Sequence, residues 1–376
     1  MINSLYIHIP FCATKCSYCS FNSYAGLEAL QDRYVECLLA EMEGVASGAT
    51  VEPLCTMFLG GGTPSVLPAS LLIKLLGHSS RYFPCKQSTE ISMEINPGTV
   101  DLEKLDCLKR AGINRISFGV QSFIDTELAK INRMHSSQEA MAAIGMAQSA
   151  GFDNVSLDLM YGLPGQTQAS WRQSLETAIS LGVKHLSLYQ LTVEEKTPMH
   201  KMVVEGRIML PDEDILVEMD EITRGLTIEN GLLQYEISNY AQTGFQCRHN
   251  IAYWENAEYY GFGAGAVSCV GGCRKRNIAD PLLYCEVIES GRQVVIEEET
   301  LESEASFRET VIMGLRMNRG VSLLSLRQRY EKDVVDYYGE TLQALIAAKL
   351  IEQGTDYLFL TQKGRVFANV VMAELV

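Results

Sequence analysis

Short hydrophobic runs alternate with amphipathic stretches along the first half of the chain. Six runs rich in Val, Ile, Leu, Phe and Tyr have the lengths of buried strands, and they cover residues 4–10, 56–59, 90–96, 115–121, 154–161 and 185–191. Three intervening stretches have helical spacing and end at or just before a glycine, at residues 101–110, 139–150 and 171–181. Parallel strands need such crossover helices. The pattern therefore predicts an α/β fold, an open and partial (β/α)6 TIM-like barrel over about residues 1–200.

The pattern changes from about residue 200 onward. It predicts a helix at 212–230, a short strand at 234–238, a loop at 240–249, helices near 305–317, 322–330 and 340–349, a hairpin-like pair around 351–360 and a last helix. The order of the last elements resembles a small winged-helix unit. We therefore expect three parts: a barrel core at 1–200, a linking region at 201–300 and a mainly helical, winged-helix-like module at 301–376.

The chain is strongly acidic. It has 31 Lys and Arg against 46 Asp and Glu, a formal net charge of −15 over 376 residues. Residues 301–376 contain 9 basic and 10 acidic side chains, so the winged-helix-like module offers no basic face for DNA. We therefore expect no nucleic-acid partner, and the net charge also argues against non-specific binding to anionic lipid.

The sequence also indicates the compartment. No apolar run reaches the roughly 18 residues that a membrane span needs, so we expect no integral membrane segment. The first residues, MINSLYIHIPFC, have neither a basic n-region nor an A-x-A-like cleavage site, and the expected location is cytoplasmic. In a reducing compartment, a cluster among the eleven cysteines points to metal binding or catalysis and not to disulfides.

Polar residues follow each of the six predicted strands. Active sites of barrels are built on the loops at the carboxyl ends of the strands. Here those positions hold Cys12-x3-Cys16-x2-Cys19, Gly60-Gly61-Gly62-Thr63-Pro64, Glu94-x-Asn96-Pro97-Gly98, Gln121, Asp158 and Gln190-x-Thr192. A purely structural barrel would have apolar or generic turn residues there. We therefore predict a single shared site at this end of the barrel.

The cysteines separate into two groups. Eight are scattered and mostly in apolar surroundings, where we expect small core residues; among them Cys269 and Cys273 are only a weak metal candidate. The other three share one loop after the first strand: Cys12, Cys16 and Cys19. A structural zinc site needs four ligands, and no second C-x2-C pair is present. Three thiolates would hold three corners of a [4Fe-4S] cubane and leave the fourth iron open to an exchangeable ligand.

Several sequence blocks resemble a known family. Cys12-Ala-Thr-Lys-Cys16-Ser-Tyr-Cys19 is similar to the C-x3-C-x2-C signature of the radical SAM superfamily, with Tyr18 as its aromatic residue. Further blocks resemble the coproporphyrinogen dehydrogenase group, and within it the HemW-type haem chaperone branch: YIHIPFC, FLGGGTPS, MEINPG, RISFGVQSF, NVSLDLMYGLPGQT and HNIAYW. The dehydrogenase branch has a further Cys two residues after the third, where this chain has Phe21. That difference favours the chaperone branch.

The resemblance implies roles for individual residues. Cys12, Cys16 and Cys19 match the cluster ligands. The residues matching contacts to S-adenosylmethionine (SAM) are Tyr6, Tyr18, Gly61, Gly62, Thr63, Glu94, Gln121, Arg133 and Asp158. His249, in the HNxxYW motif, is the candidate haem ligand; the alternative is a hydrogen-bonded loop histidine packed beside Trp254. His8 is expected to be a buried histidine with satisfied hydrogen bonds.

The resemblance also implies the functions to be weighed. The first is a haem chaperone that binds a [4Fe-4S] cluster, SAM and haem, receives an electron from a donor and passes haem to an acceptor protein. The second is oxygen-independent coproporphyrinogen III dehydrogenase, which forms protoporphyrinogen IX. A third is a radical SAM enzyme with an unrelated substrate. Residues 1–200 would then be the radical SAM core, 201–300 the region with the haem motif and 301–376 a HemN-type module. Four cations are candidates to meet the porphyrin propionates: Arg248, Arg274, Lys275 and Arg276.

Overall fold

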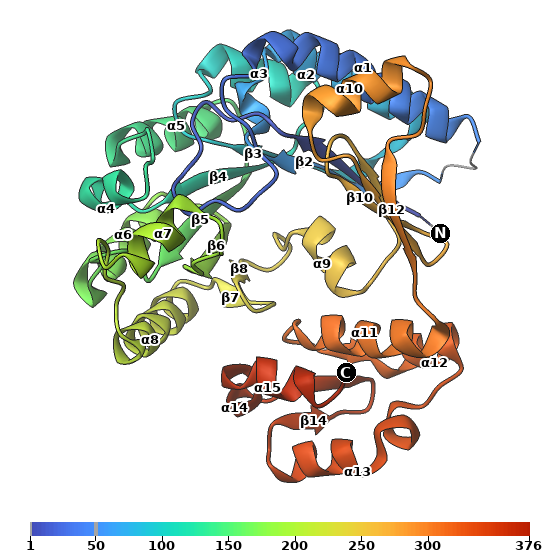
Figure 1. The fold of residues 1–376 in the computed structure, drawn as a ribbon. Coiled ribbons are helices and arrows are strands. Elements are labelled where there is room, and N and C mark those ends of the chain that lie inside the picture. The colour runs from blue at the N-terminus through green and yellow to red at the C-terminus, as the bar shows by residue number, and fades with distance from the viewer. Residues whose placement is uncertain (1, 49–51) are drawn as a thin grey trace.

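The computed structural model describes residues 2–48 and 52–376, and most of its first half is built around one curved sheet (Figure 1). The sheet has nine strands in the order β7-β8-β6-β5-β4-β3-β2-β1-β9. Their bounds are β1 Ser4–Ile9, β2 Leu54–Gly61, β3 Cys85–Ile95, β4 Arg115–Gln121, β5 Asn154–Tyr161, β6 His185–Gln190, β7 Leu233–Gln234, β8 Asn239–Ala241 and β9 Tyr260–Phe262. β1 to β6 are parallel in sequence order, and the two end strands of the described sheet do not pair. The predicted α/β fold with an open barrel is confirmed.

Helices cover the convex side of the sheet (Figure 1). In the first half of the chain they are η1 Glu28–Leu30, α1 Gln31–Ala46, η2 Pro64–Val66, α2 Ala69–Tyr82, α3 Leu102–Arg110, α4 Asp125–Lys130, α5 Ser137–Ser149 and α6 Gln168–Ser180. Successive side chains of a strand point to opposite faces. In β1, Leu5, Ile7 and Ile9 are fully buried in the core shared with α1 and α2.

The concave face of the sheet is polar instead of apolar. Tyr6 and His8 alternate with the core residues of β1, and the same alternation places Glu94 in β3 and Asp158 in β5 on this face. Polar side chains on the inner face of a barrel can bind a ligand near the strand ends, which a purely apolar interior could not do. Two more helices flank this region, α7 Pro198–Val204 and α8 Glu213–Glu229.

The linking region adds strands to both ends of the sheet. The predicted strand at 234–238 is wrong, because the chain turns there to form the antiparallel pair β7 and β8. The turn is held by Tyr235 N–H donating to Asn239 O at 3.1 Å and by the Glu236 carboxylate accepting from Ser238 N–H at 3.1 Å. At the other end, β9 pairs in parallel with β1.

The predicted loop at 240–249 is also partly wrong. β8 takes up its first residues, and His249 lies in the first turn of a helix, α9 Arg248–Trp254. The Glu90 carboxylate in β3 accepts hydrogen bonds from the backbone N–H groups of Arg248 (3.1 Å) and His249 (3.2 Å). These are N–H groups that a helix start leaves without partners. α9 lies on the concave side of the sheet, between it and the C-terminal module (Figure 1).

A three-stranded antiparallel sheet leads to the C-terminal module. It contains β10 Val267–Val270, β11 Cys273–Asn277 and β12 Val295–Thr300, with α10 Pro281–Glu289 between the last two. The module comprises α11 Ser303–Leu315, β13 Val321–Ser322, α12 Leu323–Tyr330, α13 Val334–Ala347, β14 Ile351–Gln353, β15 Tyr357–Leu360, α14 Gln362–Val366 and α15 Ala368–Ala373. It has its own hydrophobic core around Phe307, Leu342 and Leu358. Within the described residues no helix is both long and apolar enough to cross a membrane.

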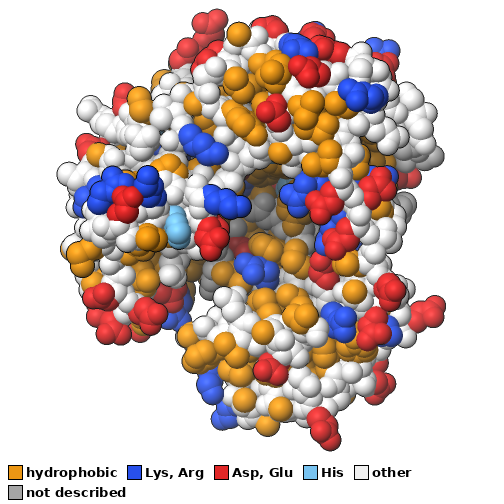
Figure 2. Space-filling model, in the orientation of Figure 1, with side chains coloured by type: hydrophobic (Ala, Val, Ile, Leu, Met, Phe, Trp, Pro, Cys, Tyr) orange, Lys and Arg blue, Asp and Glu red, His pale blue; other side chains and the backbone are white. Residues whose placement is uncertain are grey.

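The module is fastened to the end of α9. Asn256 donates hydrogen bonds to Glu309 (3.1 Å) and Thr310 (3.0 Å) in α11, and its carbonyl accepts from Arg329 in α12 at 2.7 Å. The Arg316 guanidinium at the end of α11 lies 4.7 Å from the Trp254 ring. α9 is therefore held by the barrel at its start and by the module at its end. Figure 2, in the same orientation, shows a hollow in this part of the surface.

Candidate cluster and cofactor site

Eleven of the thirteen residues singled out from the sequence line one pocket at the carboxyl ends of the strands. They are Cys12, Cys16, Cys19, Tyr18, Gly61, Gly62, Thr63, Glu94, Gln121, Arg133 and Asp158. The pocket is also lined by Lys15, Phe21 and Asn96. Tyr6 does not line the pocket and is hydrogen-bonded to His8, and His249 does not line it either. Residues at the ends of β1 to β5 thus share one pocket, whereas Gln190 and Thr192 at the end of the sixth strand do not line it.

Backbone hydrogen bonds hold the cysteine loop in place. Cys12 N–H donates to Tyr24 O at 2.9 Å, and Tyr24 N–H donates to Pro10 O at 2.7 Å. Ser17 N–H reaches Ile131 O at 3.3 Å. The three thiols are thus brought to one pocket by hydrogen bonds of the protein itself. All eleven cysteines are free thiols, including the three in the loop.

Arg133 supplies a cation beside the thiols. Its Nη1 donates to Cys16 Sγ at 3.3 Å, and its Nη2 donates to Asn96 Oδ1 at 3.0 Å and also to Gly119 O. The guanidinium is mostly enclosed, and its Nε has no partner among the described residues. A cation that donates to sulfur stabilises the thiolate form. Three thiols and one guanidinium in one pocket are a donor set suited to an iron–sulfur cluster. Within the described residues, no three Cys, His, Asp or Glu side chains are already grouped closely enough to hold a metal ion, so the thiols would have to draw together around a cluster.

The two glycines after β2 are required by close packing. Gly61 has φ +118, and a Cβ there would lie 2.6 Å from His8 Cε1. At Gly62 a Cβ would lie 2.6 Å from the Phe11 carbonyl oxygen and 3.0 Å from Cys12 Sγ. Gly61 excludes a side chain because the end of β2 lies against the His8 ring of β1, and Gly62 excludes one because it lies directly against the start of the cysteine loop. Thr63 continues this contact, with its hydroxyl 3.6 Å from Cys12 Sγ and accepting from Asn96 Nδ2 at 2.9 Å.

Two carboxylates lie on the concave face beside these loops. Glu94 Oε2 accepts from Gly61 N–H at 3.1 Å, and Asp158 Oδ1 accepts from Ser117 Oγ at 3.0 Å. Burial, and then the neighbouring Asp158, raise the pKa of Glu94 from its ordinary 4.5 to about 8. Burial also raises the pKa of Asp158, against the hydrogen bonds it accepts. The pair can bind hydroxyl donors or a cation, and Gln121, with φ 71, closes the same wall.

Aromatic side chains flank the pocket. The Tyr6 hydroxyl bonds His8 Nδ1 at 2.9 Å, and His8 Nε2 bonds Asn22 O at 2.8 Å. Because a carbonyl only accepts, Nε2 is the protonated nitrogen and Tyr6 donates to Nδ1. His8 is therefore the buried, satisfied histidine that the sequence predicts, and burial lowers its pKa. Tyr18 packs with α7 residues in a small apolar cluster around Met199.

His249 is not part of this pocket. Its ring is 1% exposed, with Nδ1 2.8 Å from Thr56 Oγ1 and Nε2 3.2 Å from the Tyr253 hydroxyl. Burial lowers its pKa to about 3, so the ring is neutral. Both nitrogens are engaged, so binding iron would require His249 to give up a hydrogen bond. The haem-ligand assignment remains a prediction from the motif.

Two residues outside the predicted set connect these features. Asn96 joins Thr63 to Arg133, and its position at the end of a predicted strand is the signal that could have found it. Glu90 holds α9 through contacts 158 and 159 positions away along the chain, for which the sequence has no local signal. Three of the four cations expected to meet propionates are already ion-paired: Arg274 with Glu309, Lys275 with Glu298 and Arg276 with Glu297. The fourth, Arg248, donates to Ser88 O at 2.7 Å.

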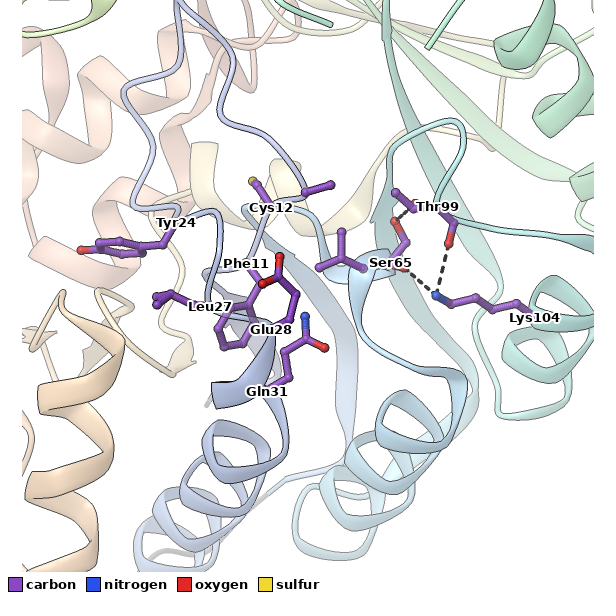
Figure 3. Close-up of a pocket in the computed structure, with 11 residues that line it drawn as sticks. Phe11, Cys12, Tyr24, Leu27, Glu28, Gln31, Ser65, Thr99 and Lys104 are labelled. Atoms are coloured by element: carbon purple, nitrogen blue, oxygen red, sulfur yellow. Dashed lines mark hydrogen bonds between the residues drawn. The ribbon is translucent and has the colours of Figure 1, made fainter. Parts of the chain in front are cut away.

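A second cavity lies on the other side of Cys12 (Figure 3). Its volume is about 320 Å³, and its lining includes Phe11, Glu28, Gln31 and Lys104. Glu28 in η1 and Gln31 at the start of α1 extend into it (Figure 3), whereas the Lys104 ammonium donates to backbone carbonyls at its edge. Cys12 therefore forms a wall between the predicted site and an open cavity on the outer side of the loop.

Comparisons with known proteins agree with this geometry. The radical SAM superfamily matches residues 6–178, and the HemN C-terminal domain matches residues 301–367. The haem chaperone HemW of Bacillus subtilis is 38% identical over 371 residues, covering 98% of each chain. That of Escherichia coli is 42% identical over 70% of this chain and 69% of its own. The structure of the radical SAM enzyme coproporphyrinogen III oxidase (HemN) from Escherichia coli has a TM-score of 0.87, at 23% identity, covering 100% of this chain and 90% of its own. That likeness establishes the fold. The identity over nearly the whole length shows that the chain belongs to the HemW family of radical SAM proteins.

Proposed function

We propose that this protein is a haem chaperone that binds a [4Fe-4S] cluster, SAM and haem and passes haem to an acceptor protein. The observation that carries the proposal is the convergence of three cysteine thiols and five strand-end loops on one pocket, in a chain related to HemW over nearly its whole length. The fold alone is shared with an oxidase and does not distinguish the two activities.

Cys12, Cys16 and Cys19 would hold the cluster. The loop hydrogen bonds bring the three cysteines to one pocket, and the Arg133 guanidinium compensates negative charge at Cys16. When bound with SAM, such a cluster supplies an electron to the sulfonium group and so generates a 5′-deoxyadenosyl radical. This electron has to come from a donor. The cavity behind Cys12 gives a donor an approach that does not cross the SAM pocket.

The remaining pocket residues would hold SAM. Gly61 and Gly62 present backbone to the ligand without a side chain in the way. Arg133 can meet a carboxylate, and Glu94 and Asp158 can accept from hydroxyl or ammonium groups. Tyr18 and Phe21 provide apolar surface at opposite sides of the cluster loop. Each of these proposed contacts to SAM requires the side chain to keep the orientation that its hydrogen bonds give it in this structure.

Phe21 occupies the position at which the chaperone branch differs from the decarboxylating dehydrogenase branch. It lines the pocket and is 66% exposed, so it offers an apolar ring where the dehydrogenase branch has a thiol. Haem is the cargo that the names of the HemW relatives indicate. An apolar ring at the rim suits contact with a macrocycle and provides no fourth thiolate near the cluster.

The test starts from anaerobic reconstitution of the full chain. Wild type is expected to hold one cluster, to bind SAM, to retain ferric haem through gel filtration and to lose that haem to an added apo-haemoprotein. A Cys12→Ala, Cys16→Ala, Cys19→Ala variant should lose the cluster and SAM binding, whereas Cys107→Ala, at a scattered cysteine on α3, should keep both. A wild-type chain that retains no haem would contradict the proposal.

A further inference from the structure

The cavity on the outer side of Cys12 has the size of a small-molecule site. Its volume is about 320 Å³, within the range of about 300–1,000 Å³ that is usual for ligand pockets. It opens between the cysteine loop, the start of α1 and the loops after β2 and β3 (Figure 3). Apart from Cys12, none of the candidate residues for the cluster, SAM or haem lines it. The proposed function uses this cavity only as an approach for an electron donor.

Two polar side chains in the cavity are free to bind a ligand. Gln31 at the start of α1 is only 8% exposed, and Figure 3 shows its amide directed into the cavity with no hydrogen bond to the other residues drawn. Leaving a buried amide without a partner costs about 1–3 kcal/mol. Glu28 in η1 points into the same space, and no described residue forms an ion pair with it. An amide and a carboxylate together offer both hydrogen-bond donors and acceptors to a bound molecule.

The other polar groups at the edge of the cavity are already occupied. The hydroxyls of Ser65 and Thr99 bond each other at 2.6 Å, and the Lys104 ammonium donates to the carbonyls of the same two residues at 2.6 and 3.2 Å. The apolar part of the wall includes Phe11, Leu27 and Val66. A molecule that suits this lining has apolar faces and N–H and C=O groups along one edge, which describes a flat heteroaromatic ring.

Cys12 connects this cavity to the predicted cluster pocket. Of the three cysteines in the loop, only Cys12 lines both spaces. A redox group in the cavity would therefore contact one side of a residue whose sulfur binds iron. This step rests on the proposed function, because it takes Cys12 as a cluster ligand.

We propose that the cavity binds the isoalloxazine ring of a reduced flavin, which supplies the electron to the cluster. Gln31 would pair with one N–H and one C=O of the pyrimidine edge of the ring, and Glu28 would accept from a further N–H. One electron leaves the flavin and one enters the cluster, and no atom passes between them. Nicotinamide fits less well, because it transfers a hydride, which carries two electrons, to a centre that takes one. The ring can belong to a free coenzyme or to a carrier protein that exposes it.

The first measurement is binding of FMN to the cluster-free full chain, followed by quenching of flavin fluorescence. Gln31→Leu keeps the bulk of the side chain and removes the amide. It should weaken FMN binding roughly tenfold, and Glu28→Gln should weaken it roughly threefold. Gln343→Leu, at a glutamine that lines another open cavity in the C-terminal module, is the matched control and should change nothing. Circular dichroism reports whether each variant folds.

The second measurement is the rate at which the reconstituted cluster is reduced, followed by its absorbance. Three reductants are compared: photoreduced FMN, a photoreduced flavodoxin as a flavin-carrying protein, and dithionite. Dithionite is a small reductant that needs no ring site. Gln31→Leu should therefore slow reduction by a flavin donor roughly tenfold and leave reduction by dithionite unchanged.

The outcomes identify the source of the ring or overturn the inference. An effect of Gln31→Leu with both flavin donors assigns the cavity to the ring itself, whereas an effect with flavodoxin alone assigns it to a flavin held by a carrier. FMN binding and flavin rates that are unchanged in both Gln31→Leu and Glu28→Gln overturn the inference. Slowing that extends equally to dithionite also overturns it, because the change would then lie in the cluster.

The same experiments keep this inference apart from the proposed function. Wild type that retains and transfers haem, with flavin rates that do not depend on Gln31, refutes only the inference. A chain that retains no haem refutes the haem chaperone, and FMN binding to the cluster-free protein still decides whether the cavity is a flavin site.

Discussion

Arg133 donates a hydrogen bond from Nη1 to the sulfur of Cys16 over 3.3 Å, while its other amino group contacts Asn96 and Gly119. One guanidinium thus joins the cysteine loop after β1 to the loop after β3 and to the backbone of β4. The sulfur that would hold iron and the polar groups that would hold SAM share a single cation. Changes at Arg133 are therefore expected to affect SAM binding more than cluster assembly.

Replacing Arg133 by Gln tests this division. The three thiols remain in place, so iron and sulfide content after reconstitution should match wild type. SAM affinity should fall roughly tenfold or more, because a charge-assisted hydrogen bond contributes about 1.5–3 kcal/mol. Equilibrium dialysis with labelled SAM measures it. Arg172→Gln, at an exposed pair with Glu176 on α6, is the control. Unchanged SAM affinity in Arg133→Gln would contradict the assignment.

Gly62 tests the packing of the two loops. Alanine there would place Cβ 2.6 Å from the Phe11 carbonyl, and a shift of that backbone moves Cys12. We expect Gly62→Ala to lower the free energy of unfolding by about 1–3 kcal/mol and to reduce the iron retained after gel filtration. In α2, Gly77→Ala meets no atom within 4 Å and should be neutral or stabilising by up to about 1 kcal/mol. Equal iron retention in the two variants would show that the close contact does not position the cysteine loop.

The raised pKa of Glu94 predicts that the stability of the fold depends on pH. Its folded-state pKa of about 8 exceeds the ordinary 4.5, so the native state holds this proton more tightly than the unfolded chain. Stability from this group is complete below about pH 4.5 and is lost as the pH rises through about 8. Glu94→Gln cannot lose a proton, so urea unfolding of the apo-protein should show it gaining on wild type between pH 5 and 8.5, by a few kcal/mol at order of magnitude. A stability difference that is constant with pH would disprove the shift.

The hydrogen bonds that Glu90 accepts are expected to stabilise the start of α9. Its carboxylate accepts from the N–H groups of Arg248 and His249 at the helix start. Removing it in Glu90→Ala should cost about 1–3 kcal/mol and increase hydrogen exchange across residues 248–254. Cluster content should stay at the wild-type level. Glu43→Ala, which removes an acceptor for Tyr82 at the outer surface, should leave exchange in α9 unchanged.

The sequence was most informative where its signals are local. The six parallel strands and the polar residues that follow them are marked by periodicity and by glycines, and eleven of the thirteen candidate site residues do meet in one pocket. The helical start at His249 was missed because Glu90, far away in sequence, completes it. The hairpin of β7 and β8 depends on the Glu236 side chain, which an alternating pattern does not register. The ion pairs of Arg274, Lys275 and Arg276 could not be foreseen from the sequence, because their partners lie on β12 and α11.

The most direct measurement of the central claim is porphyrin analysis after anaerobic turnover. Reconstituted full-length protein is incubated with SAM, a strong reductant, ferric haem and coproporphyrinogen III, and the porphyrins are separated. A haem chaperone should return the coproporphyrinogen unchanged and keep haem with the protein, whether or not SAM is cleaved. Formation of protoporphyrinogen IX in step with 5′-deoxyadenosine would contradict the account and make the protein a decarboxylating enzyme.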